Sequence, residues 1–483
     1  MPPGLWSSSS AALVPLLTLV GTAIGILAFD AWTTWRLSAW VALTSLAIAP
    51  VLMLIAIVSG QGGMAQGVLA GDGMAAFWAL LLCAAGGVAI LIGLGHAQDA
   101  SRSAGGFHAL VLLAVAGALI VAQSTHMLSL AIGLAVLHVA LGALSGPRGA
   151  WRYLAVHGAG LACFCFGLAM LYGATGSMQI DVLAGVLHRQ VSAGAAGGLS
   201  PNPLAALGLG AIGAGLGLAM GIVPFHAWLP GSCQGSTLPG ACLIACALPG
   251  AALAAWVRLG EVFAEHLAAG AAARPLAVLG ALSAVSGYAS ALRSRSLRRA
   301  LAGLVTAQSG TWLWAWAVFL PDGRARLFYL LLGHSLAMFC LWAVVASTGQ
   351  GRRVDLGDIA GLGRRHPLLA AVLTLCLLNI VGMPPLAGAL GQLYLFRAAM
   401  AGGHGWAVGM AIAGNLLAWL LCGRVLSVVE GSRAVWVRPS QEDEPLHVAP
   451  EMLVVALGAA GSLAWIGLYA PAVIGWIDSL LSG

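Results

Sequence analysis

Apolar residues dominate this chain in repeated runs, each about 20 residues long, that alternate with short polar segments. A helix of about 20 apolar residues crosses the hydrocarbon core of a bilayer. The first run lacks a charged leading segment and a convincing cleavage site, so we interpret it as a retained helix. We predict fourteen membrane-spanning helices, near residues 11–29, 40–59, 74–95, 107–123, 127–145, 153–174, 204–223, 237–258, 275–291, 299–320, 326–347, 367–392, 405–428 and 452–476.

Composition excludes a soluble protein. Of the 483 residues, 60% are hydrophobic and 7% charged, with a mean hydropathy of +0.96, whereas soluble domains carry about 25% charged residues. All 21 basic residues are arginines; fourteen follow odd-numbered helices, Arg424 lies near the same side, and six follow even-numbered helices. The positive-inside rule then places both termini outside the cytoplasm of a bacterial-type inner membrane. The arginines are scattered over short loops, so the net charge of +6 does not indicate nucleic-acid binding.

Prolines interrupt two of the predicted helices. Pro224 lies in the seventh, and Pro384 and Pro385 lie in the twelfth. Proline has no amide proton, so it opens the helical hydrogen-bond ladder, and neighbouring groups have to satisfy the freed carbonyls at membrane depth. Such breaks are typical either of an ion or substrate path or of a simple packing kink.

The segment around the first break, V-P-F-H-A-W-L-P at Val223–Pro230, resembles a signature of the antiporter-like membrane subunits of respiratory complex I, of Mrp sodium/proton antiporters and of formate hydrogenlyase-type membrane hydrogenases. The segment SRSLRRALAGLVTAQSG from Ser294 resembles the family pattern D-L-K-R-x-x-A-Y-S-S-x-x-Q-x-G, with Ser296 in place of the acid. The segment G-M-P-P-L-A-G-A-L-G-Q-L-Y-L-F from Gly382 resembles the family's G-I-P-P-L-A-G-F-x-G-K-x-Y-L-F.

The resemblance implies an all-α polytopic membrane fold with two inverted five-helix repeats. The breaks fall on the seventh and twelfth helices, each the fourth helix of its repeat, and corresponding broken helices are the mark of such repeats. We therefore divide the chain into helices one to three, the first repeat, the second repeat, and a polar loop with a last helix: 1–106, 107–258, 275–428 and 429–483.

Charged residues that the family carries inside its membrane helices are missing here. The resemblance implies a glutamate in helix five, basic residues in helices seven, eight and eleven, and a lysine in helix twelve. A buried lysine can load and release a proton, which alanine cannot do and which arginine, always protonated, cannot replace. The corresponding positions are Ala135, Ala219, either Ile244 or Gly250, Met338 and Gln392.

Histidines remain as possible proton carriers. His138 lies three residues after Ala135, His226 lies at the first break, and His334 fits the family's histidine position in helix eleven. With Gln392 and ordered water they would form a lysine-free path. Each also has a structural interpretation: His138 and His334 as neutral packing residues, and His226 as a donor to the carbonyls that Pro224 frees.

The leading functional hypothesis is a membrane subunit of a complex I-like or hydrogenase-like redox assembly, with a degenerate or rewired proton channel and a largely structural role. The alternatives are a proton or cation transporter acting through histidines, and the membrane subunit of a two-component inorganic-carbon uptake system. The chain shows no nucleotide, flavin or iron-sulfur motif, and its nine cysteines lack metal-binding spacing. We therefore expect no catalytic site, cofactor or metal in this chain, and other membrane subunits and lipid as its partners.

Overall fold

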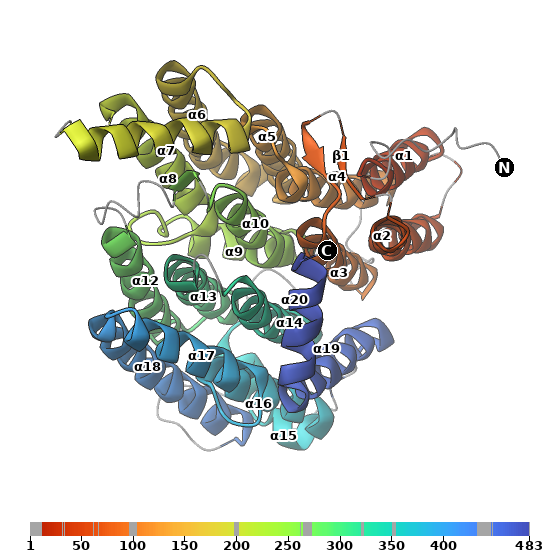
Figure 1. Ribbon diagram of the computed structural model, residues 1–483. Helices are drawn as coiled ribbons and strands as arrows, with labels where there is room; N and C mark the ends of the chain where they lie inside the picture. Colours follow the sequence, from red (N-terminus) through yellow and green to blue (C-terminus); the bar gives the residue numbers. More distant parts are fainter. Residues whose placement is uncertain are drawn as a thin grey trace.

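A computed structural model gives the architecture (Figure 1). It describes residues 12–30, 32, 34–60, 62–65, 67–95, 104–197, 202–260, 262–263, 273–319, 323–349, 354–431, 446 and 448–482. The polar loop from Glu430 to Glu451 therefore lies mostly outside the described residues.

Helices form nearly all of the described secondary structure. The first part of the chain contains α1 (Val14–Ala28), α2 (Trp35–Val58), α3 (Gly73–Gly95), α4 (Ala104–Gln123), α5 (Met127–Leu144), α6 (Gly146–Thr175), α7 (Ile180–Gly197), α8 (Pro203–Met220), α9 (Leu229–Gly235) and α10 (Leu238–Arg258). The second part contains α12 (Ala273–Arg293), α13 (Leu297–Phe319), α14 (Arg324–Thr348), the 3-10 helix η2 (Leu356–Ile359), α15 (Leu362–Arg365), α16 (Pro367–Val381), α17 (Ala387–Ala401), α18 (Gly405–Val429), α19 (Pro450–Leu468) and α20 (Ala470–Ser482). One antiparallel hairpin pairs β1 (Met64–Ala65) with β2 (Leu69–Ala70).

These helices confirm the prediction of an all-α polytopic membrane protein. Eleven helices in the described residues are long and apolar enough to cross a membrane, and α1, α16 and α20 are shorter apolar helices. The count of fourteen crossings and the inverted relation of the two repeats stay predictions.

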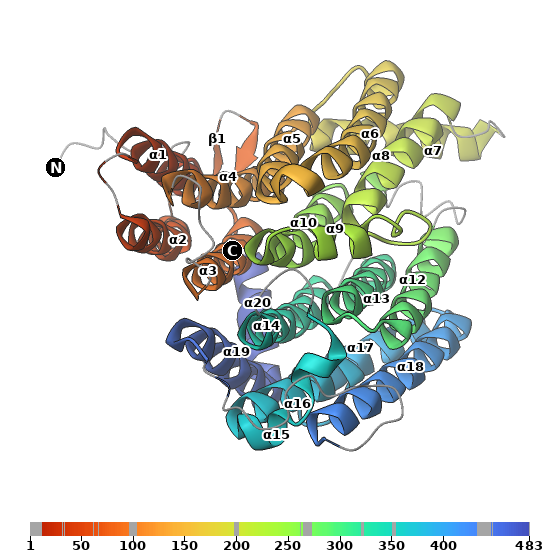
Figure 2. The ribbon, with the colours of Figure 1, turned by 180° about the vertical axis from the view of Figure 1, so that it is seen from behind.

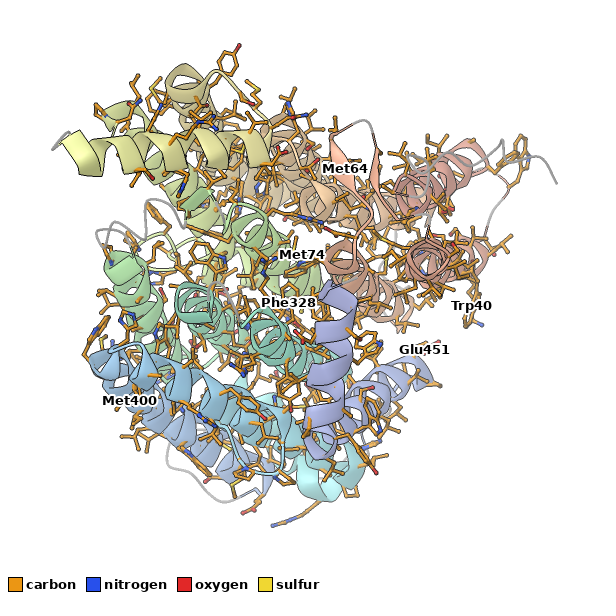
Figure 3. All side chains as sticks on the ribbon, in the orientation of Figure 1. Trp40, Met64, Met74, Phe328, Met400 and Glu451 are labelled. Carbon is orange, nitrogen blue, oxygen red and sulfur yellow. The ribbon has the colours of Figure 1, made fainter. Side chains whose placement is uncertain are left out.

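Two helices, α10 and α14, form the centre of the molecule, and the others surround them (Figures 1 and 2). In the most apolar window of each helix, 94% of α10 and 89% of α14 are buried, against 33% of α6. Phe328 of α14 is fully buried and stacks on Phe77 of α3 with ring centroids 4.6 Å apart. Trp40 and Met400 lie at the periphery and are more than half exposed, as expected for lipid-facing side chains (Figure 3).

Glycines allow some helix pairs to pack backbone against backbone. A Cβ at Gly287 of α12 would lie 2.3 Å from the amide nitrogen of Ala307 in α13. A Cβ at Gly167 of α6 would lie 2.5 Å from the carbonyl oxygen of Gly208 in α8. Close approach of small residues is a main source of helix association in membranes, where lipid removes much of the hydrophobic driving force.

The structure differs from the sequence prediction at the last helix. The run 452–476 was predicted as one helix, but α19 ends at Leu468 and α20 begins at Ala470. Pro471 in the first turn of α20 has no amide proton to continue the ladder of α19. Helix α20 packs against the first residue of α3, where a Cβ at Gly73 would lie 1.5 Å from the carbonyl oxygen of Leu480.

Helix α7 was missed because it is amphipathic rather than uniformly apolar. Leu183, Ala184 and Leu187 are buried along one face, whereas His188 and Arg189 are exposed. This spacing is that of a helix lying with one face on a protein or membrane surface. In Figure 1, α7 runs lengthwise across the view, unlike its neighbours α5 and α10.

Candidate functional site

The first helix break is closed by side chains that satisfy the interrupted backbone. Helix α8 ends at Gly221, whose positive φ of 67° suits glycine. The indole Nε1–H of Trp228 donates to the carbonyl of Leu218 at 3.0 Å. The amide of Val223 donates to Oγ of Ser283 in α12 at 2.9 Å. The break thus connects the end of α8 to α12.

For His226 we expect either a donor to the carbonyls that Pro224 frees or a proton carrier, and both stay predictions, since the contacts described at the break are those of Trp228 and Ser283. Nδ1 of His226 is buried and has no hydrogen-bond partner among the described residues. The side chain lines a cavity of about 1290 Å³. Charged and polar groups from three segments share this lining: Gln234, Ser286, Ser290, Arg293, Ser294, Arg295, Ser296, Arg299 and Asp355.

The second break is organised around Asn379, a buried residue in the last turn of α16. Its Nδ2 donates to the carbonyl of Gly333 in α14 at 3.1 Å, and its Oδ1 accepts from the amide of Gly388 at 2.8 Å. A Cβ at Gly388 would lie 1.8 Å from the carbonyl oxygen of Asn379, so only glycine fits there. One amide side chain therefore joins α14, α16 and α17.

Gln392 is the residue for which the sequence analysis expects a lysine in related proteins, and both ends of its amide are engaged. Its Oε1 accepts from Nδ2 of Asn415 in α18 at 2.8 Å. Its Nε2 donates to the carbonyl of Ile380 at 3.3 Å, in the last turn before the break. The side chain is buried and uncharged, and its geometry is that of a group that satisfies the interrupted helix.

His334 lies one residue after Gly333, whose carbonyl Asn379 binds. It is fully buried in α14, and its Nδ1 accepts from Nε1–H of Trp312 in α13 at 3.2 Å. Its Nε2 has no partner among the described residues. One turn further on, Met338, another position where the sequence analysis expects a lysine in related proteins, is buried.

His138 belongs to a cluster that the sequence analysis did not predict. Its Nδ1 lies 3.2 Å from the hydroxyl of Tyr153 in α6. Its ring stacks on that of His157, also in α6, with centroids 4.5 Å apart and an interplanar angle of 24°. The ring of His157 meets that of Trp228 at 4.3 Å, edge to face. The structure thus brings His138 to the first break, and no hydrogen bond or ring contact in the described part of the chain links this cluster to His334.

His157 and Tyr153 were missed because their relation to His138 is non-local. A histidine in the apolar run 153–174 was the available signal, since an ionisable group inside a membrane helix is a candidate functional residue. Asn379 and Asn415 are polar residues within the twelfth and thirteenth predicted helices, which likewise marked them as candidates.

Apolar packing fills the other family positions. Ala219, Ile244 and Met338 are buried, and a Cβ at Gly250 would only touch the ring of Trp78 at 3.5 Å. Ala135 is half-buried on α5. None of these side chains can carry a proton.

An ion pair joins three helices at the opposite end of α10 from the break. Arg258 donates through Nη1 and Nη2 to the two carboxylate oxygens of Asp72 at 2.6 and 2.8 Å. Its Nε donates to the carbonyl of Ala122 at 2.6 Å. Burial raises the pKa of Asp72, but the Arg258 guanidinium and the amide of Ala75 lower it more, and the resulting pKa lies below its usual value.

Replacing Asp72 by asparagine is expected to lower stability at neutral pH by about 1 kcal/mol, because the half-exposed carboxylate is screened by water. The pKa is lower in the folded than in the unfolded state, so this contribution is present above about pH 3.8 and is lost as pH falls through the folded-state pKa. Thermal unfolding of the detergent-solubilised protein should show a difference between wild type and Asp72→Asn at pH 7 that shrinks toward pH 3. The exposed Asp478→Asn is the control, and an equal difference at both pH values would contradict the expectation.

Metal-binding geometry is absent from the described residues: no three histidine, cysteine, aspartate or glutamate side chains gather there. The nine cysteines are free thiols. The expectation that this chain holds no cofactor stays a prediction.

Comparison with known proteins gives a consistent result. Residues 124–418 match the family described as NADH:quinone oxidoreductase/Mrp antiporter, transmembrane. NADH-quinone oxidoreductase subunit N of Desulfovibrio desulfuricans is 29% identical over 97% of this chain and 96% of its own length. A chain of respiratory complex I from Thermus thermophilus superposes with a TM-score of 0.79 at 27% identity, over 95% of this chain and 98% of that one. A chain of the archaeal membrane-bound sulfane sulfur reductase shares the fold, with a TM-score of 0.82 at 18% identity over 99% and 98%.

Proposed function

Because the chain belongs to the NADH:quinone oxidoreductase/Mrp antiporter membrane family, we propose that it is an antiporter-like membrane subunit of a complex I-like or hydrogenase-like redox assembly. Its role there is largely structural, and the family's charged route for protons is lost or rewired. In this proposal redox chemistry belongs to partner subunits, and the sequence of this chain shows no nucleotide, flavin or iron-sulfur motif.

The engagement of Gln392 is the observation that supports this proposal most. A lysine at this position would change charge when it carries a proton. Gln392 instead uses its amide nitrogen for the Ile380 carbonyl and its amide oxygen for Asn415. Breaking such buried hydrogen bonds leaves donors and acceptors unsatisfied, at a cost of about 1–3 kcal/mol each. The amide therefore acts as a permanent part of the helix break.

Neutral groups perform the same task at the first break. Trp228 and Ser283 satisfy backbone groups there, and Ala219 occupies the position of the family's lysine. Both breaks thus keep the shape of the fold without its charges. This favours a spacer over the histidine-based transporter or the inorganic-carbon uptake subunit considered from the sequence.

The remaining parts of the proposal concern placement. The chain is a multi-pass membrane protein, and we place both termini outside the cytoplasm of a bacterial-type inner membrane on the arginine distribution. The two repeats comprise residues 107–258 and 275–428. Their partners are other membrane subunits and lipid.

Affinity purification of the tagged chain in mild detergent, followed by mass spectrometry, tests the assembly. We expect other antiporter-like subunits and redox subunits to co-purify in fixed proportion. An unrelated tagged multi-pass protein from the same membrane is the control. Recovery of the chain alone, or with one soluble partner, would contradict the proposal.

A further inference from the structure

His157 lies deep in the membrane part of the fold. It is eleven residues from the start of α6, which at 1.5 Å per residue is about 16 Å along the helix axis. Its side chain is fully buried, and neither Nδ1 nor Nε2 has a hydrogen-bond partner among the described residues. Two unsatisfied ring nitrogens are costly in an apolar interior, and a water molecule at this site would give them a hydrogen-bond partner.

Aromatic groups surround this imidazole closely. The ring of Tyr153 lies 4.1 Å from that of His157, and its hydroxyl lies 3.2 Å from Nδ1 of His138. Trp228 presents its ring at 4.3 Å and is itself fixed by its bond to Leu218. Aromatic faces within about 6 Å stabilise a cation. The rings of Tyr153 and Trp228 therefore offset part of the cost of placing one positive charge on His157 inside the apolar fold.

We propose that His138 and His157 form a proton-binding site beside the first helix break, and that this pair holds one proton at a time. The step is the addition of a proton from water to a ring nitrogen lone pair, and no electrons are transferred. Two imidazolium ions with ring centroids 4.5 Å apart would repel each other strongly, so one histidine stays neutral when the other is charged. This inference concerns proton binding within the chain and does not rest on the proposed assembly.

Few other charged groups face the pair from the helices packed against α6. Helix α8 contains no titratable side chain, and α5 contributes only His138. Helix α9 contributes Cys233, and α7 lies at the far end of α6, where Gln190 donates to the carbonyl of Ala174. The titratable residues of α7 are therefore far along the helix: Asp181, His188 and Arg189. Within α6 itself Arg152 is exposed, and His226 lies two residues before Trp228 in the break segment. The titratable groups that contact one another in the site are the two histidines and Tyr153.

The test is ¹⁵N NMR of ring-labelled histidines in the full chain, held in lipid nanodiscs, over a pH titration. Strongly interacting groups titrate as a pair rather than separately. In wild type we expect one proton to bind to the pair. In His138→Phe, which keeps an aromatic ring in the stack, the His157 signal should titrate alone, with a midpoint at least about one pH unit from that of wild type.

His404→Phe, in the loop between α17 and α18, is the matched control and should leave the signals of the pair unchanged. If His138→Phe fails to fold, Tyr153→Phe removes only the hydroxyl and should still shift the midpoint of the pair. Absence of any protonation of His138 or His157 between pH 4 and 10 would overturn the proposal. So would unchanged midpoints in both folded variants.

Discussion

Replacing Asn379 by leucine is expected to destabilise the folded protein by about 2–4 kcal/mol, because two buried backbone groups each lose a hydrogen bond. The carbonyl of Gly333 loses a donor and the amide of Gly388 loses an acceptor. Leucine keeps a branched Cγ but can neither donate nor accept a hydrogen bond, so both contacts of Asn379 are lost. The measurement is thermal unfolding of the purified chain in detergent, together with the yield of monodisperse protein.

Asn202→Ala provides the comparison. Asn202 caps the start of α8 through its bond to the amide of Leu204, at an exposed site. Loss of such a cap costs typically about 1 kcal/mol. A loss for Asn379→Leu no larger than that for Asn202→Ala would show that the second break does not depend on Asn379.

Replacing Arg298 by methionine is expected to have a similarly large effect. Arg298 is 1% exposed, and its Nη1 donates to the carbonyl of Ser236 at 3.0 Å and approaches that of Gln234 at 3.5 Å. It thereby holds the segment between α9 and α10 against the start of α13. Methionine keeps much of the aliphatic volume but donates no hydrogen bond, so we expect a loss of about 2–4 kcal/mol in unfolding measurements.

The neighbouring Arg299 is a closely matched control. It is exposed and lines the cavity next to His226 rather than binding a backbone carbonyl. A surface substitution of this kind usually changes stability by less than about 0.5 kcal/mol. Equal effects of Arg299→Met and Arg298→Met would contradict the structural role assigned to Arg298.

The sequence alone determined the class of protein and the places where its helices break. Apolar runs of membrane length fixed the all-α membrane fold, because lipid offers the backbone no hydrogen-bond partners. Prolines at 224, 384 and 385 fixed the breaks, because a missing amide proton acts within one helical turn. The local motifs also indicated the family, which the match over residues 124–418 confirms.

Tertiary structure alone decided what each polar side chain does. Arg298 and Arg299 are adjacent arginines that the sequence pattern does not distinguish. The packing of α13 against α9 buries Arg298 and leaves Arg299 exposed. His138 became part of a pair only because α5 packs beside α6. Trp228 donates to the carbonyl of Leu218 beside the first break, a contact that the sequence did not indicate. Several hydrogen-bond partners lie far apart in the chain, as Asn379 and Gly333 or Arg298 and Ser236 do, so their identity follows from which helix faces meet and not from any local pattern.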